Sequence, residues 1–147
     1  YFRTLTQKTD DPELQNAVIM GRKTWDSIPP RFRPLSKRLN VVLTRQTAYT
    51  AEPGVLIAAS FDEALAVLSD DPEVGHIFVV GGGAVYQETI IHRQCTAVFL
   101  TEIDKSFECD TFFPKLPESF ELDTRSEIQT ENGISFTYAI YRRRQGA

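Results

Sequence analysis

The sequence predicts an α/β fold: one domain with a mostly parallel, twisted sheet, flanking helices and a C-terminal antiparallel hairpin. Three observations predict it. Short apolar runs rich in β-branched residues alternate with stretches of helical periodicity. Most of these runs lack polar/apolar alternation, as expected for strands covered on both faces. Alternation returns near the C-terminus, around an Asn-Gly turn signal. A length of 147 residues suits a single domain.

Five apolar runs are expected to form strands. Their short length and their content of Val, Ile and Leu are typical of buried strands. They are residues 17–20, 39–44, 55–58, 77–80 and 97–103.

The clearest helix is expected over residues 61–68. Its apolar residues follow the i, i+3, i+4, i+7 spacing of one helical face, and they are Phe61, Ala64, Leu65 and Leu68. Ser60 and Glu63 form a capping box before it, and Asp71-Pro72 ends it.

Two further helices are expected after glycines. A short one follows Gly21 and carries Trp25 and Ile28. The other follows the run Gly81-Gly82-Gly83 and carries three apolar or aromatic residues, Val85, Tyr86 and Ile90.

The C-terminal third is expected to be antiparallel. Residues 120–128 and 134–141 flank residues 131–133, where Asn-Gly is a strong hairpin signal. Phe136, Tyr138 and Ile140 alternate with the residues between them, which indicates a strand with two different faces.

Composition and charge disfavour several classes of function. The net charge of -4 disfavours a nucleic-acid binder, and the one basic run, residues 142–144, is expected to be a solvated tail. No apolar stretch approaches the ~20 residues that span a bilayer. We therefore expect no nucleic-acid and no membrane partner, and we expect a monomer.

The cysteines and histidines carry no metal motif. Cys95 and Cys109 lie far apart, without a C-x-x-C pair or a His at ligand spacing. Two free thiols are typical of a reducing cytosol, so a cytoplasmic location is expected. Neither His76 nor His92 lies in a motif such as H-E-x-x-H, and no metal site is expected.

The segment Gly21-Arg22-Lys23-Thr24-Trp25 is a candidate anion site. It follows a buried strand and opens a helix, where free N–H groups, two cations and a hydroxyl could hold a pyrophosphate. The alternative is that Arg22 and Lys23 are merely exposed residues of a first helical turn. Against this, cations at a helix N-terminus are unfavourable unless an anion compensates them.

Two more strand ends are candidate phosphate sites. Thr44-Arg45 follows the strand at residues 39–43, and an Arg beside a hydroxyl suits a phosphomonoester such as the 2′-phosphate of NADP. A solvated Arg at a strand end is the alternative. The run of glycines at residues 81–83 lets the backbone approach a ligand closely, although it does not fit G-x-G-x-x-G and could be only a tight turn.

The segment Ile28-Pro29-Pro30-Arg31-Phe32-Arg33-Pro34-Leu35 is stiff and apolar. It could wall a flat aromatic ligand, with Arg38 just beyond it to bind a carboxylate. The alternative is a packed surface loop with a structural Arg.

The order and spacing of these motifs resemble dihydrofolate reductase. The segments that carry the resemblance are Asn16-Ala-Val-Ile-Met-Gly-Arg-Lys-Thr-Trp-Asp-Ser-Ile-Pro29, Arg33-Pro-Leu35, Leu43-Thr-Arg45, Ile77-Phe-Val-Val-Gly-Gly-Gly-Ala-Val-Tyr86 and Asp110-Thr-Phe-Phe-Pro114. They span nearly the whole chain, and the last one looks most like a eukaryotic or fungal member. The resemblance implies reduction of dihydrofolate to tetrahydrofolate by NADPH.

The resemblance also implies roles for single residues. Matches to cofactor-binding positions are Gly21, Arg22, Lys23, Thr24, Thr44, Arg45, Val80, Gly81, Gly82, Gly83, Ala84, Val85 and Tyr86. The Gly81-Gly82 peptide is cis in the family. Matches to folate-contacting positions are Phe2, Ser27, Ile28, Leu35 and Arg38, the last binding the glutamate α-carboxylate. Thr101 matches the hydroxyl that hydrogen-bonds the catalytic carboxylate.

The catalytic carboxylate itself marks a departure. In the family it lies three residues before the position of Tyr1, together with a first, central strand. The chain does not begin with Met, so we expect that further residues precede Tyr1 and that residues 1–147 alone fold poorly and are nearly inactive. Asp26, beside Trp25, does not replace the missing acid.

Two other functions stay open. A riboflavin-pathway reductase shares the fold and the glycine turn, but residues 25–29 followed by Arg38 favour the folate enzyme. A catalytically incomplete nucleotide-binding fragment is the other possibility. The coding sequence upstream of Tyr1 discriminates among these readings.

Overall fold

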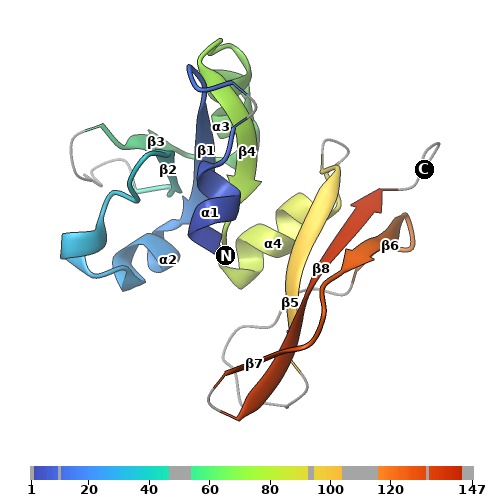
Figure 1. Ribbon diagram of the computed structural model, residues 1–147. Helices are drawn as coiled ribbons and strands as arrows, with labels where there is room; N and C mark the ends of the chain where they lie inside the picture. The colour runs from blue at the N-terminus through green and yellow to red at the C-terminus, as the bar shows by residue number, and fades with distance from the viewer. Residues whose placement is uncertain are drawn as a thin grey trace. The chain divides into compact units, whose positions relative to one another are not determined.

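The computed structural model describes residues 2–9, 11–46, 54–92, 95–103, 116–131 and 133–143. The chain divides into two compact units, Tyr1–Tyr86 and Gln87–Ala147, here called the N-terminal and C-terminal units. The first contains a parallel sheet and the second an antiparallel sheet (Figure 1). Both parts of the expected α/β architecture are therefore present, while the expectation of a single domain stays a prediction. No helix in the described ranges is long and apolar enough to cross a membrane.

The parallel sheet has the strand order β3-β2-β1-β4. Its strands are β1 (Gln15–Gly21), β2 (Leu39–Leu43), β3 (Leu56–Ala58) and β4 (Val74–Val79). All of its pairings are parallel. The four expected strands are confirmed, although β4 begins at Val74, earlier than predicted, because Gln15 at the start of β1 pairs with Val74.

Strand β1 is buried on both faces, which explains why its sequence shows no alternation. Ala17 and Ile19 pack with α3 (Phe61–Ser69) on one face. Val18 and Met20 pack with Trp25 of α2 (Arg22–Ser27) on the other. Successive side chains of a strand point to opposite faces, so one continuous apolar run serves two cores.

Helix α3 begins with the predicted capping box. The Ser60 hydroxyl accepts a hydrogen bond from the Glu63 N–H at 3.1 Å. The Glu63 carboxylate accepts from the N–H of Ala59, also at 3.1 Å, one residue before the usual partner. The helix ends at Ser69, with Asp70 as its C-cap, just before Asp71-Pro72.

The expectation that the helix after Gly21 carries Ile28 is wrong. Helix α2 ends at Ser27, and Ile28 is extended, with φ -78° and ψ 126°. Pro29 explains this, since the ring of a proline disfavours helical backbone at the residue before it. Two elements were not expected at all, the helix α1 (Phe2–Gln7) and the 3₁₀ helix η1 (Pro30–Phe32).

The C-terminal unit contains a sheet of order β5-β8-β6, with β7 also paired to β8. Its strands are β5 (Ala97–Ile103), β6 (Phe120–Arg125), β7 (Gln129–Glu131) and β8 (Ile134–Arg143), all antiparallel. The division between the units falls inside α4 (Gly83–Ile90), which begins at the third glycine of the predicted turn. Ile90, at its end, packs with Val98 and Phe120.

The prediction of one continuous strand over residues 120–128 is wrong. At Ser126 the side-chain hydroxyl, not a backbone carbonyl, accepts the N–H of Tyr138 at 2.8 Å. Pairing with β8 then resumes in β7, and the expected hairpin through residues 131–133 is confirmed, with Gly133 at φ 77°. The regular pairing with β8 is therefore interrupted between β6 and β7, because the Ser126 hydroxyl takes the place of a backbone carbonyl as hydrogen-bond acceptor.

Among the strands that the structure describes, five pair with one neighbour only: β3, β4, β5, β6 and β7. Strand β4 is half-buried along most of its length, in contrast to β1.

Candidate functional site

Three of the predicted ligand-binding motifs lie at one edge of the parallel sheet. Gly21 pairs with Leu43 at the ends of β1 and β2, and Ile19 pairs with Val79 at the end of β4. The chain then continues into residues 22–24, 44–45 and 80–83. In parallel sheets, ligands bind outside the carboxyl ends of the strands.

A backbone contact joins two of these motifs. The Gly21 N–H donates to the Gly81 carbonyl oxygen at 2.8 Å, and the Val80 N–H donates to that of Ile19 at 2.9 Å. The β1–β4 pairing is thereby extended by backbone bonds beyond Val79. A Cβ at Gly21 would lie 3.2 Å from Val85 Cγ2, which is closer than ordinary contact, so a larger residue there would require the Val85 side chain to shift by a few tenths of an ångström.

The turn at Gly81-Gly82 is cis, as the resemblance implies, and Gly81 has φ 128°. Two hydroxyl groups lie beside it. A Cβ on Gly81 would be 3.5 Å from both Thr24 Oγ1 and the Tyr86 hydroxyl oxygen, and one on Gly82 would be 3.3 Å from Thr24 Oγ1. Burial raises the pKa of the Tyr86 hydroxyl above its ordinary value, so this group is neutral around pH 7.

The remaining residues of the cofactor-matching turn lie at the start of α4. Gly83 and Ala84 form its first turn, and the Tyr86 N–H donates to the Gly82 carbonyl oxygen at 2.9 Å. A glycine turn without side chains, flanked by two hydroxyls, fits the close approach of a nucleotide.

Two cations follow Gly21 at the start of α2. Arg22 Nη1 forms an ion pair with the Asp26 carboxylate at 3.1 Å, one helical turn away, and the two side chains are 34% and 45% exposed. Lys23 is exposed. Asp26 thus pairs with Arg22, and the expectation that it does not replace the catalytic acid stays a prediction.

Thr44 and Arg45 follow β2. The Thr44 N–H donates to the Ala58 carbonyl oxygen at 2.9 Å, and its hydroxyl accepts from the Gln46 N–H at 3.1 Å. These bonds fix the backbone turn after β2. Arg45 is exposed there, just past the end of the strand that pairs with β1.

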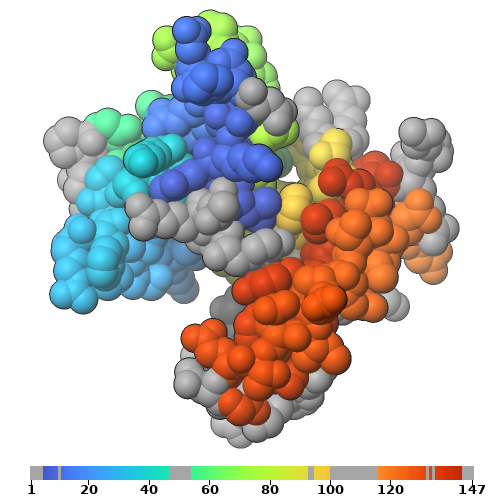
Figure 2. Space-filling view, viewed as in Figure 1, coloured from blue at the N-terminus to red at the C-terminus, as the bar shows by residue number. Residues whose placement is uncertain are grey.

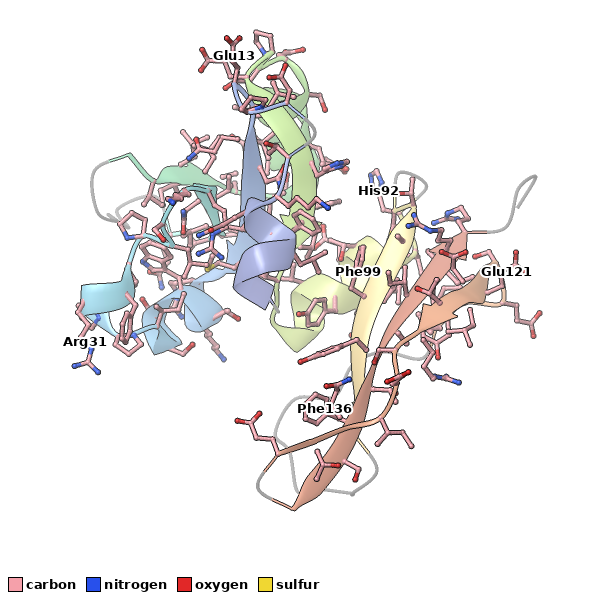
Figure 3. The ribbon with its side chains drawn as sticks, in the orientation of Figure 1. Glu13, Arg31, His92, Phe99, Glu121 and Phe136 are labelled. Atoms are coloured by element: carbon pink, nitrogen blue, oxygen red, sulfur yellow. The ribbon has the colours of Figure 1, made fainter. Side chains whose placement is uncertain are left out.

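The predicted apolar wall follows α2. Ile28 and Leu35 both pack against the core cluster that contains Trp25. The Ser27 hydroxyl donates to the Thr24 carbonyl oxygen at 2.6 Å. Figure 2 shows this segment, in light blue, at the rim of the N-terminal unit, and Figure 3 shows Arg31 at its outer end, directed away from the sheet.

Arg38 is a buried cation, with 7% of its surface exposed. Its Nε donates to the Ser36 carbonyl oxygen at 2.9 Å, and its Nη1 donates to Thr6 Oγ1 at 3.0 Å. A buried guanidinium requires many acceptors, and it is well suited to bind a carboxylate through two parallel hydrogen bonds.

Two other predicted residues cannot be assigned contacts. Phe2 begins α1, and Thr101 lies in β5, where its backbone pairs with Tyr138, but both side chains lie outside the described residues. Residues 110–114 also lie outside them.

Sequence reasoning missed three buried polar residues around Arg38: Thr6, Asn16 and Asn40, which are 1%, 0% and 2% exposed. A signal existed for the asparagines, because Asn16 opens one apolar run and Asn40 interrupts another. Polar residues inside predicted buried strands indicate specific hydrogen bonds.

Comparisons with known proteins identify the family of the chain. The family described as dihydrofolate reductase matches residues 2–143. The dihydrofolate reductase of Aedes albopictus is 43% identical over 96% of this chain and 81% of its own length. That of Drosophila melanogaster is 42% identical over 95% of this chain and 80% of its own length. A bifunctional dihydrofolate reductase-thymidylate synthase of Glycine max is 42% identical over 96% of this chain and 28% of its own length. The chain belongs to the dihydrofolate reductase family.

Proposed function

We propose that the protein reduces 7,8-dihydrofolate to 5,6,7,8-tetrahydrofolate with NADPH, in one-carbon metabolism. The observation that carries the proposal is that three ligand-binding motifs lie at one edge of the parallel sheet, two of them joined by the Gly21–Gly81 hydrogen bond. Membership of the dihydrofolate reductase family supports the same reaction.

The cofactor would lie along the strand ends. Arg22, Lys23 and Thr24 would bind its pyrophosphate, and Arg45 with Thr44 would bind the adenosine 2′-phosphate. Residues 80–86 would contact the part of the cofactor that passes the glycine turn, where the glycines carry no side chain and the hydroxyls of Thr24 and Tyr86 lie close by. The nicotinamide ring supplies the hydride.

The substrate would lie against Ile28 and Leu35, with Phe2 and Ser27 beside it. Arg38 would bind its glutamate α-carboxylate by charge-assisted hydrogen bonds. Reduction adds one hydrogen at each of positions 5 and 6 of the pterin, one as hydride and one as a proton. In the family the proton is supplied with the help of a carboxyl group, and Thr101 matches the hydroxyl that hydrogen-bonds that group.

A monomer in the cytoplasm is part of the proposal. Cys95 is a free thiol whose pKa is raised by burial, which keeps it protonated and unreactive, as suits a structural cysteine in a reducing compartment.

The test is NADPH oxidation by the full-length protein, followed by absorbance, with dihydrofolate as substrate. Turnover should require dihydrofolate, and a riboflavin-pathway pyrimidine substrate should give none. Turnover of the pyrimidine alone would overturn the proposal. Bound NADPH without turnover of either substrate would indicate a nucleotide-binding protein instead.

A further inference from the structure

Arg38 lies between two backbone segments that are each fixed by a buried asparagine. On the first side, Asn16 Nδ2 donates to the carbonyl oxygens of Thr6 at 3.0 Å and Lys8 at 2.7 Å. Asn16 Oδ1 accepts from the His76 N–H at 2.7 Å. One fully buried side chain therefore ties the C-terminal end of α1 to β1 and to β4, and sets the position of Thr6.

On the second side, Asn40 fixes the loop that leads to Arg38. Its Nδ2 donates to the carbonyl oxygens of Leu35 at 2.9 Å and Arg38 at 2.8 Å, and its Oδ1 accepts from the Leu35 N–H at 2.9 Å. Gln7 joins the two sides directly, because its Nε2 donates to the Ser36 carbonyl oxygen at 3.0 Å.

The guanidinium of Arg38 is bonded to both sides at once. Its Nε donates to Ser36 in the loop, and its Nη1 donates to the hydroxyl of Thr6 in α1. Two bonds from different nitrogen atoms fix the plane of the group, because the guanidinium is rigid and planar. Thr6 is 1% exposed, so water cannot take over the role of its hydroxyl without a rearrangement.

We infer that Thr6 is a positioning residue for substrate binding: its hydroxyl holds the Arg38 guanidinium in the orientation in which it donates hydrogen bonds to the substrate's carboxylate. The inference rests on the proposed function, which gives Arg38 that carboxylate. A bidentate pair needs both planes aligned, and a guanidinium fixed beforehand loses less rotational freedom on binding. Asn16 contributes indirectly by holding the backbone of Thr6.

The experiment compares Thr6→Val with wild type in the full-length protein. Valine keeps the shape and removes the hydroxyl. The KM for dihydrofolate should rise about tenfold, since a hydrogen bond to a charged group is lost. The KM for a dihydropterin without the aminobenzoylglutamate tail, and the Kd for NADPH, should not change. Thr6→Ser should recover most of the affinity because it restores the hydroxyl.

Thr89→Val is the matched control. Thr89 is also buried, 5% exposed, but it lies in α4, in sequence far from Arg38. This variant should have a lower melting temperature, and the ratio of the KM for dihydrofolate to the KM for the tailless dihydropterin should stay as in wild type. If Thr6→Val does not fold, Thr6→Ala should show the same selective effect.

Two failures can be told apart. If Thr6→Val raises both KM values equally, or changes only the melting temperature, Thr6 is merely structural and the inference is wrong. If Arg38→Leu also raises the KM for dihydrofolate no more than the KM for the tailless dihydropterin, the proposed role of Arg38 is itself wrong.

Discussion

Gly21 and Gly81 are joined by a backbone hydrogen bond of 2.8 Å, although they lie far apart in the sequence. This bond holds the glycine turn after β4 against the start of α2, and Val85 Cγ2 lies 3.2 Å from where a Cβ on Gly21 would be. Two motifs that are individually weak signals thereby become one surface at the sheet edge.

Arg45 should determine the preference for NADPH over NADH. Replacing it with Ala removes charge-assisted hydrogen bonds to the 2′-phosphate, worth ~1.5–3 kcal/mol. The Kd for NADPH should rise by roughly one to two orders of magnitude, and that for NADH should change little. Fluorescence titration with both cofactors measures this. A mutant that still discriminates fully would exclude Arg45 as the 2′-phosphate ligand.

Arg38→Leu should raise the KM for dihydrofolate by at least tenfold, because the mutation removes charge-assisted bonds to the carboxylate. The Kd for NADPH should stay the same. Steady-state kinetics with dihydrofolate and with a tailless dihydropterin measure the effect. An equal loss for both substrates would contradict the assignment.

Asp26→Asn should strengthen NADPH binding about two- to threefold at low ionic strength, because Arg22 loses its competing carboxylate. The effect should shrink as salt is added, since the pair is exposed and screened. Asp123→Asn is the matched control. Asp123 forms a comparably exposed ion pair in the C-terminal unit, with 2.9 Å between its Oδ2 and Arg142 Nε. Removing this carboxylate should leave NADPH binding unchanged. Titrations at two salt concentrations provide the measurement, and an increase that persists at high salt would argue against a charge effect.

Gly75→Ala should destabilise the protein by about 1–3 kcal/mol. The new Cβ would lie 2.8 Å from Asn16 Oδ1, the acceptor of the His76 N–H, so that buried hydrogen bond must move. Gly133→Asn is the control, because position 133 has open space and a φ of 77° that asparagine tolerates. Urea unfolding of the full-length variants gives both free energies. A smaller loss for Gly75→Ala than for Gly133→Asn would show that Asn16 adapts freely.

Much of the fold could be predicted from local sequence. The strands β1, β2 and β5, helix α3 with its cap and the hairpin at Gly133 follow from signals carried within a few residues: apolar runs, helical periodicity, a capping box and an Asn-Gly turn. The order of the motifs was enough to identify the family. These features depend on propensity and spacing, which the chain specifies without its tertiary contacts.

The rest depends on contacts between distant segments. Strand β4 begins earlier than predicted because Val74 pairs with Gln15 of β1. The strand predicted over residues 120–128 is interrupted because the Ser126 hydroxyl accepts the hydrogen bond of the Tyr138 N–H. Neither partner is visible from the local pattern.

The environment of Arg38 is the clearest case. The sequence identified the arginine through its spacing, but its surroundings come from α1, β1 and the loop before β2. In the sequence Thr6 is an ordinary polar residue, and Asn16 is marked only by its place at the start of an apolar run; both are buried in the folded protein. A buried polar group must find a hydrogen-bond partner, and only the tertiary structure decides which group that is.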